Sequence, residues 1–238
     1  MKKITLLCIM LMAVATTAFA QRKKVAVVTF YADKQVGLSD VGLDGVSMVT
    51  NLMNDPNFNL QPLIEQYHDK FFGEYAKKFP FDLADEVAVT TDPDYVAYQP
   101  TYRAGDNEGR YVVAPGYKPI DQNFGKSNEQ AMLKAFPEMD GVMFVYINFE
   151  LQKGFGVGGT ATTKMRVTTV LNLYNKKGDK VFGIVEGENS KKTGVMVGGV
   201  PVMKPEKLLP MCESALNELM GDLEKRLTKI IDKSAKKL

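Results

Sequence analysis

The sequence predicts an α/β (α+β) fold: a mixed sheet that contains an antiparallel hairpin, is packed by helices, and is followed by a long carboxy-terminal amphipathic helix. Three observations lead to this class. Val25–Phe30 and Gly141–Ile147 are nearly continuous apolar runs, as in strands covered on both faces. Met165–Tyr174 alternates between apolar and polar residues, which is the period of a half-covered strand. Apolar residues near the carboxy terminus recur at helical spacing.

Turn residues and prolines indicate where the other elements begin and end. Asn175–Asp179 turns the chain from the alternating strand into Val181–Glu188, so the two strands form a hairpin. The expected helices run from Asp40 or Ser39 to about Met53, from Leu60 to Tyr75 with Pro62 in the first turn and Pro80 beyond the end, and from Ser127 to Phe136 with a capping-box spacing to Gln130.

The last helix is expected to start at Pro205 or at Pro210, because proline fits only the first turn of a helix. Its apolar stripe consists of Leu209, Cys212, Leu216, Leu219, Leu223, Leu227 and Ile230.

The segment from Phe81 to Lys126 shows no clear period. It contains four prolines within Pro93–Pro119 and seven tyrosine or phenylalanine positions. We interpret residues 81–126 as an irregular, aromatic-rich insertion with one short strand at Val87–Thr90, because disordered segments are poor in aromatic residues. Residues 21–238 are then expected to form a single α/β domain.

The amino terminus has the three regions of a cleavable signal peptide. Lys2 and Lys3 precede an uncharged run, and Ala18-Phe19-Ala20 forms a cleavage site. The apolar centre is shorter than the ~20 residues that span a bilayer, and Cys8 lies too early for lipid attachment. We therefore expect residues 1–20 to be removed and the mature chain to work in the periplasm without a transmembrane anchor, its release from the cell being left open.

The charge of the mature chain is balanced. Removal of Lys2 and Lys3 leaves 28 basic and 28 acidic side chains, so we expect no nucleic-acid partner, which would require a positive field. Cys212 is the single cysteine left, and no intramolecular disulfide can form.

The usual catalytic and cofactor patterns do not fit, so we assign no catalytic residue, cofactor or metal. Gly154–Gly159 has a glycine spacing like that of a dinucleotide loop, but it leads into a strand and offers no helix amino terminus to a phosphate. His68 is the lone histidine; it lies in the second expected helix, on the edge of the apolar stripe, and is expected to be a surface or boundary residue. Cys212 lies in the last apolar stripe, where a buried thiol is expected. One histidine and one cysteine are too few for zinc.

The insertion carries two other sets of candidates. Its acids, Asp92, Asp94, Asp106 and Glu108, match no calcium loop and are expected to be solvated, although carboxylates for sugar hydrolysis could lie among them. Its tyrosines could pack on one another or serve as stacking platforms for a glycan. These tyrosines are Tyr95, Tyr98, Tyr102, Tyr111 and Tyr117.

An apolar, glycine-rich segment from Gly194 to Met203 joins the hairpin to the last helix. Gly198 and Gly199 make it incompetent as a helix. It should either fold back onto the core or form a contact surface for another protein or a membrane. The partner-binding candidates are Val195, Met196, Val197, Val200 and Met203.

The order of elements resembles a known α/β domain. Val25–Phe30, the strand start Asp140-Gly141-Val142-Met143 and the hairpin Val170–Tyr174 with Gly178-Asp179 are similar to the domain shared by the TolB amino-terminal domain, the curli secretion channel subunit and the lipoprotein activators of peptidoglycan synthases. The resemblance covers about residues 25–53 and 127–238. It implies no catalytic residues, while residues 81–126 have no counterpart and the lipoprotein cysteine is missing.

Three functional hypotheses follow. The first is a non-enzymatic accessory protein of a Gram-negative cell envelope that acts by protein–protein binding or assembly, and a homo-oligomer is compatible with it. The second is a hydrolase with carboxylates in the insertion. The third is a glycan or small-molecule binder that uses the insertion tyrosines.

Overall fold

The computed structural model describes residues 22–41, 52–102, 108–122, 126–157 and 160–234. The signal peptide, the cleavage site and most of the helix expected before Met53 lie outside these residues. The strands are β1 (Lys24–Asp33), β2 (Asp82–Leu83), β3 (Tyr111–Val113), β4 (Gly141–Val157), β5 (Thr160–Asn175), β6 (Lys180–Val197) and β7 (Val200–Pro201).

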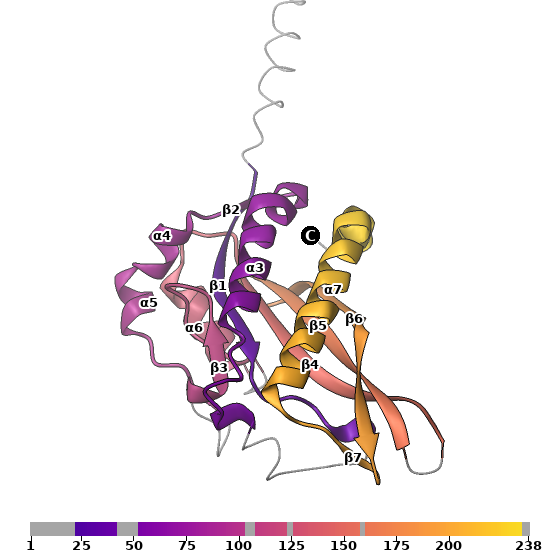
Figure 1. The fold of residues 1–238 in the computed structure, drawn as a ribbon. Coiled ribbons are helices and arrows are strands. Elements are labelled where there is room, and N and C mark those ends of the chain that lie inside the picture. The colour runs from indigo at the N-terminus through magenta and orange to yellow at the C-terminus, as the bar shows by residue number, and fades with distance from the viewer. Residues whose placement is uncertain (1–21, 42–51, 103–107, 123–125, 158–159, 235–238) are drawn as a thin grey trace, which may run out of the picture.

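Helices and single helical turns separate the strands (Figure 1). They are η1 (Ser39–Val41), α3 (Gln61–Lys70), η2 (Phe71–Tyr75), η3 (Ala76–Lys78), α4 (Glu86–Thr90), α5 (Pro93–Ala97), η4 (Glu108–Arg110), α6 (Ser127–Ala135) and α7 (Pro205–Ser234). Within the described part of the chain, every helix is too short or too polar to cross a bilayer.

The strands form one mixed sheet of seven strands, in the order β2-β1-β4-β5-β6-β7, and β3 pairs with β1. β1 and β4 run parallel, with Val25 opposite Gly141 and Ala32 opposite Ile147. The neighbours from β4 to β7 are antiparallel. The predicted fold class, including the antiparallel hairpin of β5 and β6, is confirmed.

One face of the sheet is covered by α3, η2 and α7, which Figure 1 shows side by side across the strands. The large core cluster lies between these helices and the inward side chains of β1, β4, β5 and β6. The residues predicted for the second helix are all buried: Leu60, Leu63, Ile64, Tyr67, Phe71 and Tyr75. Their spacing of three and four therefore does mark the buried face of this helix.

The long helix α7 begins at Pro205, and Pro210 lies inside it. Because proline has no N–H, Pro210 cannot donate the helical hydrogen bond to the carbonyl of Glu206. Of the predicted stripe, the five central members Cys212, Leu216, Leu219, Leu223 and Leu227 are buried, and Leu209 and Ile230 are partly buried. The stripe is thus confirmed, and the helix starts at the earlier of the two prolines.

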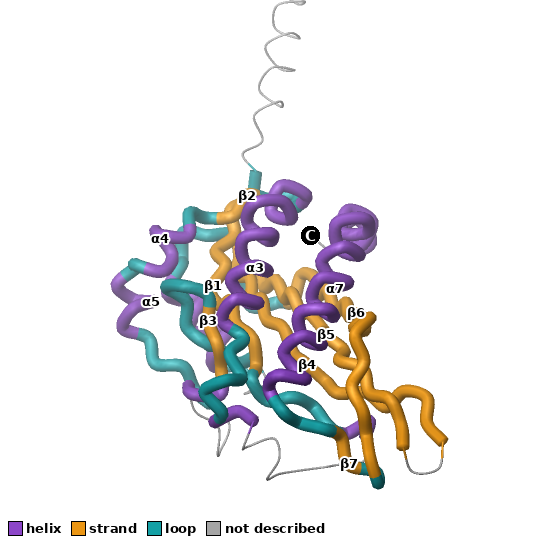
Figure 2. The backbone as a smooth tube through the Cα atoms, viewed as in Figure 1, coloured by secondary structure: helices purple, strands orange, loops and turns teal. Residues whose placement is uncertain are grey.

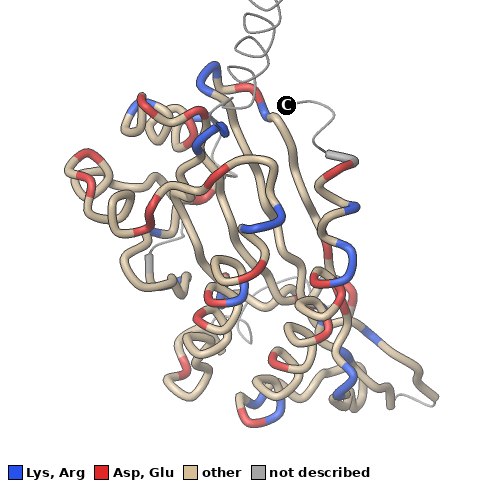
Figure 3. The backbone as a smooth tube through the Cα atoms, turned by 90° about the horizontal axis from the view of Figure 1, so that it is seen from above, with Lys and Arg blue, Asp and Glu red and all other residues tan. Residues whose placement is uncertain are grey.

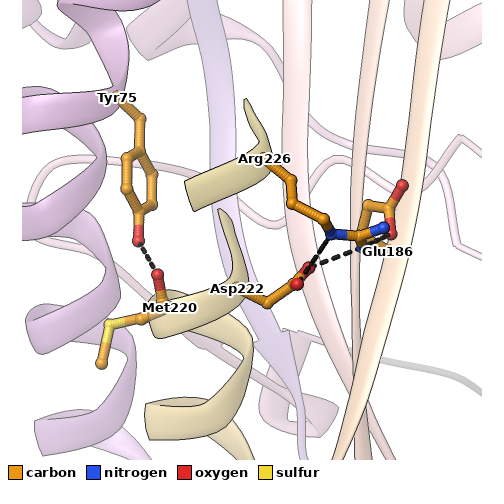
Figure 4. Close-up of polar contacts among 5 residues, drawn as sticks. All are labelled: Tyr75, Glu186, Met220, Asp222 and Arg226. Carbon is orange, nitrogen blue, oxygen red and sulfur yellow. Dashed lines mark hydrogen bonds and ion pairs between the residues drawn. The ribbon is translucent and has the colours of Figure 1, made fainter. Parts of the chain in front are cut away.

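Polar contacts hold α7 on both of its sides (Figure 4). The Tyr75 hydroxyl of η2 donates a hydrogen bond to the main-chain carbonyl of Met220, at 2.8 Å. On the other side, the Arg226 guanidinium pairs with Asp222 at 2.6 Å and with Glu186 of β6 at 2.8 Å. The helix is therefore linked to η2 and to the outer strand as well as packed between them.

The opposite face of β1 and β4 is covered by α4, α5 and α6. Their core includes Val89, Tyr95, Met132 and Phe136. The strand predicted at Val87–Thr90 is wrong, because these residues belong to helix α4. The Asp85 side chain accepts a hydrogen bond from the Ala88 N–H and caps this helix, so the local cap overrides the β-branched composition.

Residues 81–126 also contribute strands to the sheet. Asp82 and Leu83 pair in parallel with the start of β1, and Tyr111–Val113 pairs antiparallel with its end. The helix expected at residues 127–136 is confirmed, although its N-cap is Lys126 and that residue makes no side-chain capping bond.

Candidate functional site

The far end of the sheet projects beyond the helices. Figure 2 shows the ends of β4, β5, β6 and β7 extending past the start of α7. We call this part the hairpin tip and define it as Gly154–Val157, Thr160–Thr163, Gly194–Val197 and β7. At its end the ladder crosses all four strands, since Val157 lies opposite Thr160, Thr160 opposite Val197, and Val197 opposite Val200. Nearer the base the register of β4 shifts between Lys153 and Gly156, so Phe155 has no direct partner on β5.

One face of the hairpin tip exposes apolar side chains. Directly opposed residues in antiparallel strands lie on the same face, so Val157, Val197 and Val200 form a row with Thr160. Phe155 is 82% exposed and Val157 is 73% exposed. The further exposed members of this face are Val195, Val197, Val200 and Val202. Large apolar side chains are seldom left in water in such a group unless they make a contact.

The other face of the tip is closed. Ala161, Met196 and Pro201 are buried. The start of α7 lies against this face, because a Cβ on Gly194 would stand 3.1 Å from the Met211 sulfur. The tip therefore has one face that belongs to the core and one face that is free to bind.

A two-residue turn shapes the end of the tip. Gly198 and Gly199 have φ angles of 59° and 80°, and two successive positive φ values form the turn that best matches the twist of a hairpin. β6 therefore continues through Val197 and reverses into β7. Pro201 lies opposite Met196 in the short edge strand β7, where a missing N–H is tolerated.

The structure divides the predicted partner-binding residues into two groups. Val195, Val197 and Val200 are exposed on the open face, whereas Met196 is buried and Met203 is partly buried against the core. Sequence reasoning missed Phe155 and Val157, which join the same face from β4. Their signal in the sequence is the alternation of large residues with Gly154 and Gly156.

His68 and Cys212 have structural surroundings. His68 packs against the ring of Phe72, with centroids 4.8 Å apart, and its Nε2 lies 3.0 Å from Glu86. Burial lowers the pKa of His68, but the hydrogen bonds and charges of Glu86 and Asp69 together raise it by more, so the net pKa lies above its ordinary value. Cys212 is fully buried, and burial raises the pKa of its thiol well above its usual range. This thiol is not prepared to act as a nucleophile.

The acids of residues 81–126 do not converge on a metal. The Asp92 carboxylate accepts hydrogen bonds from the main-chain N–H groups of Asp94 and Tyr95 and so caps α5. Glu108 begins η4, while Asp106 falls outside the described residues. No group of three or more potential ligands that could hold a metal ion occurs within the described ranges.

An open depression of about 560 Å³ is lined by three other carboxylates, Asp82, Asp85 and Glu86. Each of them has a local role. Asp82 forms an ion pair with Arg22 at 2.8 Å, Asp85 caps α4, and Glu86 contacts His68. The hydrolase hypothesis would need a carboxylate pair facing a substrate across a gap, and these three groups are engaged in holding the fold.

The insertion tyrosines contribute to the core. Tyr95, Tyr111 and Tyr117 are buried. The Tyr95 hydroxyl donates to the carbonyl of Val28, at 3.1 Å, and accepts from the N–H of Lys118, at 2.8 Å. These three rings are therefore not available to stack on a sugar. They pack in three separate clusters with the sheet and its helices, while Tyr98 and Tyr102 are partly buried and Tyr102 stacks on Tyr111, with centroids 5.9 Å apart.

Comparisons with known proteins place the chain among distant structural likenesses. No protein family and no curated protein sequence matches it. A protein described as a neuraminyllactose-binding hemagglutinin homolog from Helicobacter pylori is 8% identical, with a TM-score of 0.36 over 91% of each chain.

Two further structures are similar at the same level. Lipoprotein GNA1162 from Neisseria meningitidis is 9% identical and has a TM-score of 0.35, over 87% of this chain and 99% of that one. The hypothetical protein CT253 from Chlamydia trachomatis is 7% identical and has a TM-score of 0.32, over 85% of this chain and 96% of that one. TM-scores this low do not establish a shared fold, and the resemblance to the TolB group stays a prediction.

The strand segments that form and flank the tip carry lysines and no acid, and we call these lysines its basic rim. Residues 152–164 and 191–204 contain five lysines and no acid, and the projecting strands in Figure 3 are tan with blue segments behind the tip. Lys191 and Lys192 pair with acids of α7, at 2.7 and 3.9 Å. The ion pairs found among the described residues do not involve Lys153, Lys164 or Lys204. The tip thus offers apolar contacts next to lysine side chains.

Proposed function

We propose that the mature chain is a non-enzymatic accessory protein of the cell envelope, and that it acts by binding another protein through the hairpin tip. The observation that carries this proposal is the open apolar face, with Phe155 at 82% exposure. A set of apolar side chains held on a rigid sheet offers a preformed contact, which lowers the entropic cost of binding.

The shape of the tip favours a protein partner. Its exposed residues lie on a flat strand surface with a single large aromatic ring, which is the arrangement of a hot spot surrounded by smaller contacts. A small ligand would need a concave site that buries most of its surface. The basic rim adds a preference for a partner whose contact surface carries carboxylates, since opposite charges across an interface speed encounter and fix orientation.

The envelope setting rests on the predicted signal peptide and on the resemblance to envelope-associated domains. A binding role also agrees with the state of the reactive groups. His68 and Cys212 are built into the fold, and the carboxylates of the depression beside η3 and α4 have structural partners.

A double variant tests the proposal. Val197→Ser with Val200→Ser removes two exposed valines from the open face without changing the turn between them. We expect an unchanged melting temperature, because neither side chain packs in the core, and loss of partner recovery from envelope extract as measured by mass spectrometry.

The matched control is Val87→Ser with Val96→Ser. These valines are similarly exposed, at 66% and 55%, but they lie on α4 and α5 away from the tip. The control should recover the partner as the wild type does. Equal recovery by the tip variant would overturn the proposal, and loss in both variants would show that the contact is not specific to the tip.

A further inference from the structure

The outer strand β6 has an open edge over Val181–Glu188. β5 lies along one side of this stretch, and among the described residues no strand lies along the other. β7 pairs only with Met196 and Val197. Nearer the middle of the strand, the Ser214 hydroxyl of α7 accepts hydrogen bonds from the N–H groups of Lys191 and Lys192, at 3.0 and 3.2 Å. The edge is therefore covered at the tip and open at its base.

This open stretch has little of the protection that is usual on an edge strand: its charged residues are two glutamates, Glu186 and Glu188. It reads Val-Phe-Gly-Ile-Val-Glu-Gly-Glu, without lysine, arginine or proline. Proteins commonly place such residues on exposed edges, because unpaired N–H and C=O groups recruit another strand. With neither lysine nor proline over Val181–Glu188, the backbone groups of this edge are open to pairing with a further strand.

An apolar row crosses the sheet and ends at this edge. Tyr31 lies opposite Tyr146, Tyr146 opposite Val170, and Val170 opposite Val185. The first three are buried, whereas Val185 is 66% exposed. Val185 therefore ends the row without an apolar neighbour on its open side, where a further strand could supply one.

We propose that two copies of this chain pair antiparallel through Val181–Glu188, with a two-fold axis at Val185. In this register Val185 lies opposite Val185 of the second copy, and Gly183 opposite its Gly187. Ile184 and Phe182 lie opposite Glu186 and Glu188, so no like charges are directly opposed within the paired stretch. The pairing joins two sheets into one and gives the open backbone groups their partners.

The sequence around Val185 suits such symmetry. Glycines stand two residues before and two residues after it, so only small residues flank the valine on its face of the sheet. The hairpin tip is a poor alternative for self-association, because its basic rim would meet the same basic rim. A second copy at the β6 edge also leaves both tips free for other partners.

The proposed register predicts a repulsion between positive side chains of the two copies. A Cβ on Gly183 would stand 2.8 Å from the Lys180 side chain, and one on Gly187 would stand 3.0 Å from the Arg166 guanidinium. The two-fold register brings Lys180 of one copy toward Arg166 of the other. Salt screens this repulsion, so we expect dimerisation to become stronger as the salt concentration rises.

Analytical ultracentrifugation of residues 21–238 over a range of concentrations tests the proposal. The wild type should dimerise, and Val185→Lys should raise the dissociation constant roughly tenfold or more without changing the melting temperature. The control is Val87→Lys, since Val87 is equally exposed at 66% and lies on α4. A wild type that stays monomeric, or a Val185→Lys dimer as strong as the control, would overturn the proposal.

A cross-link tests the register itself. Directly opposed residues of antiparallel strands have Cα atoms about 4.5–5.5 Å apart, within the roughly 4.4–6.8 Å that a disulfide spans. Val185→Cys should therefore form a covalent dimer under mild oxidation, while Val87→Cys stays monomeric. Cys212 is fully buried and should not compete. Equal cross-linking in both variants would contradict the axis at Val185, and it would leave the tip as a binding site untouched.

Discussion

β4 passes through two environments, and the difference between them separates folding from binding. Phe149 and Phe155 lie on the same strand and both flank residues paired with β5. Phe149 is 1% exposed, whereas Phe155 is 82% exposed. Phe149 is paired directly with Val167 of β5, whereas Phe155 lies in the register shift of β4 between Lys153 and Gly156. Helices cover the first ring and leave the second exposed. A strand can thus be held in place by its neighbours while its side chains remain available.

Removing the two rings should show the largest contrast. Phe149→Ala should lower the free energy of unfolding by about 3–5 kcal/mol, the usual cost of deleting a buried aromatic ring. Phe155→Ala should change it by less than about 0.5 kcal/mol while weakening partner recovery. Urea unfolding measures the change in the free energy of unfolding for each of the two variants. A large destabilisation by Phe155→Ala would mean that the open face is part of the core.

An intermediate effect is expected at the contact between η2 and α7, two of the helical elements that cover the sheet. Tyr75→Phe removes the hydroxyl that donates to the Met220 carbonyl and keeps the buried ring. We expect a loss of about 1 kcal/mol in the free energy of unfolding, typical of one buried hydrogen bond. Partner recovery should not change, because the tip lies far along the strands from this contact. If recovery fell with stability, the covered and open parts of the sheet would be coupled.

A pH-dependent effect should be the smallest. The pKa of His68 is raised above its ordinary value of 6.5: burial lowers it, but Glu86 and Asp69 together raise it by more. A raised pKa in the folded state stabilises the fold below the unfolded pKa, and this stability is lost as pH rises through the folded pKa. The free energy of unfolding should therefore fall as pH rises from 6.5. Glu86→Gln should reduce this fall, whereas Phe155→Ala should leave it unchanged.

Long periodic patterns predicted the covered part of the fold. The alternation over Met165–Tyr174 identified β5, and the stripe through Leu216 and Leu223 identified α7, because burial of one face leaves a regular trace in the sequence. β2 and β3 contain two and three residues, too few for a period to appear. Val87–Thr90 contains β-branched residues that suggested a strand, but it forms a helix because Asp85 caps it.

The candidate site was only partly readable from the sequence. The segment Val195–Met203 stood out by composition, but composition could not say that Met196 faces the core. Val157 joins the same face through its register with Thr160, and Phe155 lies in the register shift of β4 just before it; neither feature can be read from composition. Glycines around them hid the strand signal, since glycine carries no side chain to mark a face.

The position of β1 has a consequence for how this chain folds during its predicted export. β1 is the first described strand, yet its partners come much later in the chain, at Asp82, Tyr111 and Gly141. A chain that emerges amino terminus first therefore carries the apolar run Val25–Phe30 without its parallel partner until residue 141 has followed. Pairings this distant in sequence form slowly, and unpaired apolar strands aggregate. The yield of folded protein should therefore depend on how well this short run is shielded until β4 has emerged.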